Sequence, residues 1–132
     1  MQPTIEQIKE DFQFLESWED RYQYIIDLGD ELEPLIDEEK NDETFVQGCM
    51  SNVWLVIEET ENGYLHIRGD SDSAIVKGLV AMLIAFYAPV PKEKLGMYDA
   101  VQLFSEFRLE THLSPNRRNG LYALNKRIKA FE

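Results

Sequence analysis

The sequence is poor in cysteine and in basic residues, and each shortage excludes a class of protein. Cys49 is the only cysteine among 132 residues, so no disulfide can form within the chain. One cysteine and two histidines also fall short of the usual four-ligand structural metal site unless carboxylates join them. Thirteen Lys and Arg face 25 Asp and Glu, and the resulting charge of -12 repels nucleic acid and anionic membrane surfaces. We therefore expect no nucleic-acid or membrane partner, and a reducing compartment, the cytoplasm.

Long hydrophobic runs are missing too. Residues Met1–Glu10 lack the basic stretch followed by an apolar run that is typical of a secretory signal. The longest apolar run, Gly78–Val90, is too short to span a bilayer as a helix. With 44% hydrophobic and 29% charged residues and no internal repeat, the composition predicts one ordinary folded domain over residues 1–132.

The charge is unevenly distributed along the chain. Residues 1–66 hold 18 acidic and 3 basic residues, whereas residues 67–132 hold 7 acidic and 10 basic residues. The stretch Asp37–Glu43 is especially acidic, and its composition favours a solvated loop without a specific partner. A partner with a basic patch would nevertheless be attracted to the first half.

Capping patterns predict helices at the start of the chain. Thr4 and Gln7 have the spacing of a capping box, and apolar residues follow at helical intervals. Ser17 is expected to cap a second amphipathic helix, which Gly29 would end in the left-handed conformation.

The middle of the chain changes to β-branched and aromatic residues. Thr44–Gln47, Asn52–Glu59 and Tyr64–Arg68 are predicted strands, and Asn62-Gly63 is the preferred pair for a type I′ turn between the last two. Gly69 is expected to end the third strand. The pattern therefore predicts a small antiparallel meander of about three strands.

Helices are predicted again after the strands. Asp70, Ser71 and Asp72 are N-cap candidates for an apolar helix over Ser73–Ala88, which should be buried on more than one side. Asp99–Phe107 is expected to form another helix. Ser114-Pro115 is typical of an N-cap followed by proline at the first helical position, and it should begin the last helix. The expected fold class is α+β, with helices flanking the sheet.

Cys49 is the candidate nucleophile. Gly48 before it and Ser51-Asn52 after it are turn-forming residues, so the thiol is expected in a loop between two strands, where a rigid sheet can present a reactive group. A lone cysteine can equally be a small buried hydrophobic residue. Both interpretations remain open on the residues alone.

Arg117 and Arg118 lie in the first turn of the last predicted helix, where the helix dipole disfavours cations. One interpretation is that both arginines are exposed to solvent or paired with acids. The other is that a guanidinium stabilises a thiolate or persulfide anion, which would lower the pKa of the thiol. His66 and His112 have no partner acid at a fixed spacing, which favours structural roles. A Cys-His hydrolase is therefore only weakly supported.

Three segments together resemble the SufE-like family of sulfur-acceptor proteins, and the resemblance covers nearly the whole chain. The segments are Val46–Leu55, which contains Cys49, Gly69–Leu79, and His112–Leu121. The resemblance implies an α+β fold shared with the IscU-like scaffold proteins of iron–sulfur cluster assembly. It also implies a partnership with a pyridoxal-phosphate-dependent, SufS-like cysteine desulfurase, which holds the cofactor, so that this chain needs none.

The resemblance implies a role for each matching residue. Cys49 would accept sulfane sulfur as a persulfide, stimulate the desulfurase and pass the sulfur to an iron–sulfur scaffold, and Arg117 would stabilise the anion or contact the partner. The resemblance also implies a carrier without independent enzymatic turnover. One cysteine is sufficient for such a shuttle, because a thiolate attacks a persulfide directly, whereas a disulfide oxidoreductase normally needs a second cysteine. The expected partner contacts are Gln47, Gly48, Met50, Ser51, Asp70, Asp72 and Arg118.

The chain would be a monomer or a weak homodimer. The alternative is a non-catalytic acidic interaction module in which Cys49 is only structural.

Overall fold

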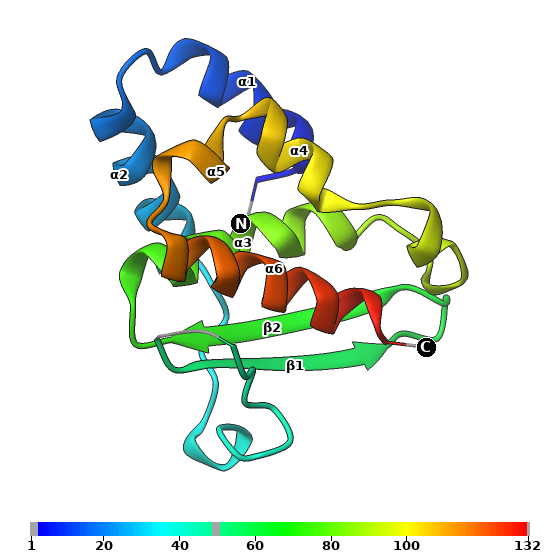
Figure 1. The fold of residues 1–132 in the computed structure, drawn as a ribbon. Coiled ribbons are helices and arrows are strands. Elements are labelled where there is room, and N and C mark those ends of the chain that lie inside the picture. Colours follow the sequence, from blue (N-terminus) through cyan, green and yellow to red (C-terminus); the bar gives the residue numbers. More distant parts are fainter. Residues whose placement is uncertain (1–2, 49–50, 132) are drawn as a thin grey trace.

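The computed structural model describes residues 3–48 and 51–131, in which helices cover one face of a two-stranded antiparallel sheet (Figure 1). In chain order the elements are α1 (Ile5–Phe14), α2 (Trp18–Asp30), the 3₁₀ helix η1 (Asp37–Glu39), β1 (Val53–Glu59), β2 (Leu65–Ser71), α3 (Ala74–Tyr87), the 3₁₀ helix η2 (Lys92–Met97), α4 (Ala100–Glu106), α5 (Leu109–His112) and α6 (Pro115–Lys129). The α+β prediction is confirmed. None of the helices in the described residues is both long enough and apolar enough to cross a membrane.

The sheet has two strands and not the expected three. β1 and β2 pair with Val53 opposite Ser71 and Glu59 opposite Leu65. The predicted strand Thr44–Gln47 contributes only an isolated bridge between Phe45 and Trp54. This stretch pairs with β1 through two hydrogen bonds, from the Val46 N–H to the Val53 carbonyl (2.9 Å) and from the Leu55 N–H to the Thr44 carbonyl (2.8 Å). Two hydrogen bonds make a bridge and not a third strand.

The hairpin turn differs from the expected type I′ turn. Gly63 has φ +83°, whereas Asn62 does not have the positive φ that a type I′ turn requires at both central residues. The Gly63 N–H donates to the Thr60 carbonyl (3.0 Å), and the Thr60 N–H donates to the Tyr64 carbonyl (2.7 Å). The connection is therefore a three-residue loop with glycine at its left-handed position.

Most predicted helix starts are confirmed by their side-chain caps. The capping box of Thr4 and Gln7 forms, Ser17 caps α2, and Ser114 caps α6 with proline directly after it. The cap of α3 is Ser73, whose side chain accepts from the Val76 N–H. The N-cap prediction for Asp70, Ser71 and Asp72 is thus wrong, and so is the strand end at Gly69, because β2 continues to Ser71.

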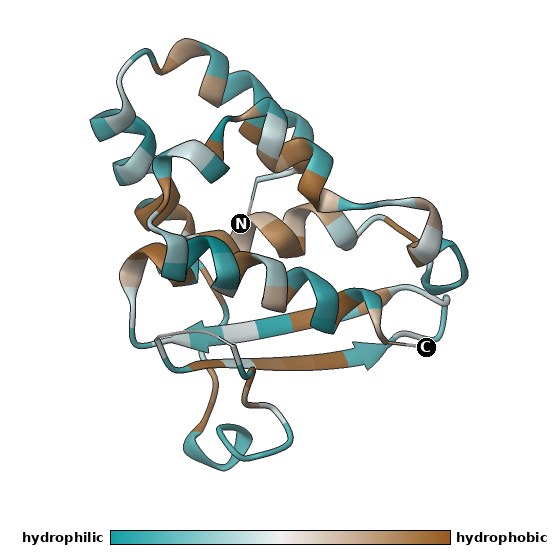
Figure 2. Ribbon diagram, viewed as in Figure 1, coloured by the Kyte–Doolittle hydropathy of each residue, from teal (hydrophilic) through white to brown (hydrophobic). Residues whose placement is uncertain are grey.

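The central helix is α3, and it packs against the sheet and against neighbouring helices. Ten of its residues are buried, as its apolar sequence predicts, and Figure 2 shows hydrophobic colour along much of its length. Gly29 of α2 lies against α3, where a Cβ atom would come within 2.7 Å of the Gly78 backbone nitrogen. The prediction that Gly29 ends α2 in a left-handed conformation is wrong, because the helix continues to Asp30 and is capped by Glu31 with φ -92°. Gly29 permits close helix packing instead.

A buried polar network joins α3 to α4 and α6. The Tyr87 hydroxyl donates to Asn125 Oδ1 (2.5 Å) and accepts from the Ala100 N–H (3.1 Å). Asn125 Nδ2 in turn donates to Asp99 Oδ1 (3.0 Å). Burial raises the pKa of Tyr87 to about 12, so the hydroxyl stays protonated and remains a donor at neutral pH.

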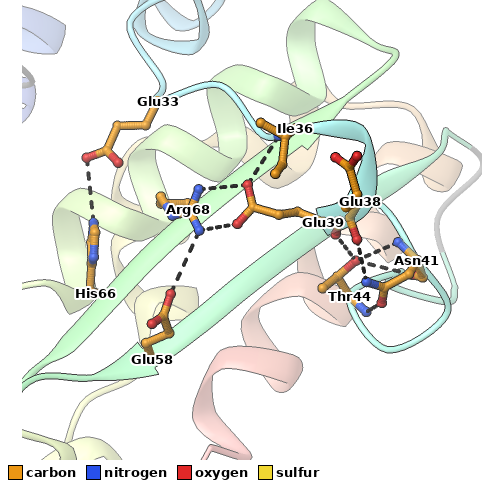
Figure 3. A network of polar contacts seen from close by, with 9 residues as sticks. All are labelled: Glu33, Ile36, Glu38, Glu39, Asn41, Thr44, Glu58, His66 and Arg68. Carbon is orange, nitrogen blue, oxygen red and sulfur yellow. Dashed lines mark hydrogen bonds and ion pairs between the residues drawn. The ribbon is translucent and has the colours of Figure 1, made fainter.

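The segment that contains η1 is attached to the outer face of the sheet. Glu39 accepts two hydrogen bonds from the Arg68 guanidinium, and these bonds lower the pKa of Glu39 (Figure 3). On the same face, His66 Nε2 lies 3.6 Å from Glu33 Oε1 (Figure 3). The acidic stretch is therefore attached to the sheet through Glu39, which binds Arg68 from 29 positions later in the sequence.

Candidate functional site

The candidate site is the connection between the Phe45 bridge and β1, in which Cys49 occurs. Cys49 and Met50 lie outside the described residues, so the site is defined by the residues on either side. Gln47 and Gly48 are exposed, and Ser51 is partly exposed. Gly48 has φ +97°, a conformation that favours glycine, and a Cβ atom there would lie 3.3 Å from Ala123 Cβ on α6. Gly48 therefore lies directly beside α6.

The segment before Cys49 is held by Arg127 of α6. The Arg127 guanidinium donates to the carbonyl oxygens of Glu43 and Phe45, the latter through Nη1 at 3.2 Å. Phe45 also contacts Trp54 of β1 edge to face, with the ring centroids 6.3 Å apart. This end of the connection is thus fixed to both the helical layer and the sheet.

The segment after Cys49 is held by Asp72. The Asn52 N–H donates to Asp72 Oδ1 (3.1 Å) and Asn52 Nδ2 donates to Asp72 Oδ2 (3.0 Å). The Asp72 N–H donates back to the Asn52 carbonyl (3.2 Å). Asp72, one of the expected site residues, therefore holds the end of the connection, whereas the neighbouring Ser73 caps α3.

Asp70, another expected site residue, is bound elsewhere. It forms ion pairs with Lys40 (2.9 Å) and Lys77 (3.5 Å), and its side chain accepts from the Ser71 N–H. Burial by itself would raise the pKa of Asp70, but the hydrogen bonds from Lys40 and Ser71 and the nearby Lys77 outweigh it and lower that pKa. The charged Asp70 carboxylate is therefore paired with Lys40 and Lys77, and it is not joined to the connection.

The two arginines lie in the first turn of α6. Arg117 is exposed, and its side chain forms no hydrogen bond or ion pair with any part of the chain that the structure describes. Arg118 is half-buried, and its charge adds to the hydrogen bonds from Tyr122 and Ser105 that lower the pKa of Glu110. Because α6 also contacts Gly48 through Ala123, one helix carries both arginines and borders the connection.

Sequence reasoning missed the residue that anchors the connection. Arg127 is near the end of α6, where a basic residue is explained by the helix dipole alone. Its partners, the carbonyls of Glu43 and Phe45, precede it by 84 and 82 positions. No local pattern indicates such a contact.

Replacing Arg127 with methionine is expected to loosen the segment before Cys49. The change keeps most of the apolar side chain and removes two charge-assisted hydrogen bonds, at a cost of about 1 kcal/mol for a half-exposed group. The Val46 and Leu55 amides, which pair this segment with β1, should exchange with solvent several-fold faster. Lys126→Met, at an exposed neighbouring position, is the matched control, and equal exchange in both variants would contradict the anchoring role.

Comparison with a solved structure agrees with the fold. The solution structure of a hypothetical protein from Thermus thermophilus matches with a TM-score of 0.75, covering 98% of this chain and 94% of that chain. The two sequences are 20% identical, so the likeness shows the shared fold alone.

Comparison at the level of sequence places the chain among domains associated with iron–sulfur metabolism. The family model described as "SufE: Fe-S metabolism associated domain" matches residues 6–132. An uncharacterized SufE-like protein of Rhizobium etli is 43% identical, covering 96% of this chain and 87% of the relative. Another, of Rhizobium meliloti (strain 1021), is 41% identical, with 96% and 93% covered. The chain belongs to the SufE family.

Proposed function

We propose that this protein is a sulfur carrier for iron–sulfur cluster assembly in the cytoplasm. It accepts sulfane sulfur on Cys49 from a pyridoxal-phosphate-dependent, SufS-like cysteine desulfurase, stimulates that enzyme by removing its bound sulfur, and passes the sulfur to a scaffold. The observation that carries the proposal is the SufE match over residues 6–132 in a chain whose single thiol is Cys49. The pyridoxal phosphate belongs to the desulfurase.

The transfer step requires only a thiolate and a persulfide. The Cys49 thiolate attacks the outer sulfur of the desulfurase's cysteine persulfide, and a new sulfur–sulfur bond forms on Cys49. The old sulfur–sulfur bond breaks, and the desulfurase cysteine leaves as a thiolate. No external oxidant or reductant is consumed. Because the chain has no second cysteine, it cannot release the sulfur by forming an internal disulfide.

The surroundings of the connection support this role. Arg127 fixes the segment before Cys49 and Asp72 fixes the segment after it, so the loop has defined ends on a rigid base. The proposed partner contacts are the adjacent Gln47, Gly48, Met50 and Ser51, with Asp72 beside them. Arg117, whose guanidinium is exposed and has no ion-pair partner in the described residues, is proposed to stabilise the sulfur anion or contact the partner. Asp70 and Arg118 are proposed as outer partner contacts.

The proposal is tested by the intact mass of the protein after incubation with a cysteine desulfurase and cysteine. We expect a gain of one or more sulfur atoms that peptide mapping assigns to Cys49 and that a reducing thiol reverses. Protein whose Cys49 has first been alkylated is the control, and it should gain nothing. An unchanged mass in the untreated protein, or sulfur bound at another residue, would refute the proposal.

A further inference from the structure

A second polar site lies in the helical layer, away from the sheet. A cleft of about 450 Å³ lies where the end of α1, the start of α2 and the turn after α4 meet. In Figure 1 these segments lie at the end of the molecule opposite the strands. Three basic side chains line the cleft, from Lys9, Arg21 and Arg108, together with the acids Glu16 and Glu106. This concentration of bases is unusual in a chain whose net charge is -12.

Arg21 is held rigidly in the cleft without an acidic partner among the described residues. Its Nε donates to the Leu15 carbonyl (2.9 Å) and its Nη2 donates to the Phe12 carbonyl (3.0 Å) at the end of α1. The guanidinium also lies over the Phe12 and Trp18 rings, at 5.5 and 5.1 Å from their centroids. These contacts use two of its five N–H donors, and the others have no partner within residues 3–48 and 51–131. Arg21 is thus a pre-positioned donor that retains hydrogen-bonding capacity.

Arg108 has a backbone conformation that arginine rarely adopts. Its φ and ψ are 59° and 26°, and it is the only residue other than glycine with positive φ in the described part of the chain. It directly follows Phe107, the C-cap of α4, at a position where glycine is usual because it adopts this conformation without strain. The exposed Arg108 side chain forms no ion pair within the described residues. A strained arginine at a glycine position suggests that its side chain is needed.

We propose that this cleft binds a small phosphate-class oxyanion, either inorganic phosphate or the terminal phosphate of a small metabolite, through Arg21, Arg108 and Lys9. Guanidinium groups match the geometry of phosphate oxygens, and the fixed position of Arg21 reduces the entropy lost on binding. In the part of the chain that the structure describes, Glu16 and Glu106 form no ion pairs with the three bases, which therefore remain available to the anion. The two acids also limit the net charge of the cleft, so removing one should strengthen binding. This site does not depend on the sulfur-carrier proposal.

The test is a titration of the full chain, followed by NMR, with inorganic phosphate and separately with glycerol phosphate at constant ionic strength. We expect saturable shifts of the Trp18 indole and Arg21 Nε signals, and saturation by either compound supports the site. Arg108→Gly should weaken binding about tenfold while raising the thermal midpoint, because glycine relieves the backbone strain. Glu106→Gln should tighten binding several-fold. Lys94→Gln, at an exposed position in η2 outside the cleft, should leave the affinity unchanged.

Three results would overturn the proposal. The first is no saturable shift with either phosphate compound. The second is an equal response to chloride at the same ionic strength, which would indicate screening alone. The third is an Arg108→Gly variant that is stabilised but binds as tightly as the unchanged protein, which would assign the arginine no part in binding.

Discussion

Cys49→Ser is expected to remove all stimulation of the desulfurase. A serine hydroxyl stays protonated at neutral pH and is a far weaker nucleophile toward sulfur than a thiolate, so it cannot accept the persulfide sulfur. No other thiol in the chain can replace Cys49. The measurement is alanine formation from cysteine by a desulfurase, with and without this protein, and the variant should give the rate of the desulfurase alone.

A binding measurement separates the loss of chemistry from the loss of contact. Cys49→Ser changes one atom, so the variant should keep its thermal midpoint and still bind the desulfurase. Full stimulation by the variant would contradict the carrier proposal and favour the acidic interaction module. That alternative predicts loss of binding on charge reversal in the acidic segment. Asp42→Lys is a suitable reversal because Asp42 is exposed, whereas Glu39 also holds Arg68 and its reversal would disturb the fold.

The elements that depend on neighbouring residues were predictable from the sequence. A helix cap needs only a side chain and a backbone N–H two or three positions later. The expected caps at Thr4, Ser17 and Ser114 all form. The burial of α3 on several sides also follows from its own composition. These features are local, and one stretch of sequence contains all the information they require.

The errors concern features that depend on distant partners. Asp70, Asp72 and Ser73 are all chemically suitable caps, and the choice among them depends on where β2 ends. That end is set by pairing with β1 up to Ser71 opposite Val53. Asp72 then binds Asn52, which stands 20 positions earlier. No local rule ranks these alternatives.

The candidate site was predictable in part, because its loop depends on local residues and the supports of that loop do not. The glycine and turn-forming residues around Cys49 indicate a loop, and Gly48 does adopt the positive φ that favours glycine. The supports of the loop could not be predicted, because Arg127 and Ala123 come from a helix that follows it by more than 60 positions. Family resemblance is the basis for proposing Cys49 as the functional cysteine, whereas the structure identifies which residues hold its neighbours in place.

Close packing of α2 on α3 explains why glycine occurs at positions 29 and 78. The sequence alone suggested a helix end at Gly29 and no role for Gly78. Gly29 lies against the backbone of Gly78 and against Lys77. Gly78 lies against the backbone and side chain of Ile25, a fully buried residue of α2. The two helices therefore approach closely at a point where each supplies a glycine, and a side chain on either would separate them.

Gly78→Ala is expected to destabilise the protein by about 3 kcal/mol. An added Cβ atom would overlap the carbonyl oxygen and Cγ2 of Ile25 and come within 2.6 Å of its carbonyl carbon, and backbone atoms cannot move aside as a flexible side chain can. Intrinsic helix propensity favours alanine over glycine by about 1 kcal/mol, so the observed loss would be net of that gain. The measurement is the free energy of unfolding in denaturant.

Gly96→Ala is the matched control, because nothing lies within 4 Å of a Cβ atom there, and it should change stability by less than about 0.5 kcal/mol. If Gly78→Ala were as stable as Gly96→Ala, the close contact between α2 and α3 at Gly78 and Ile25 would be wrong.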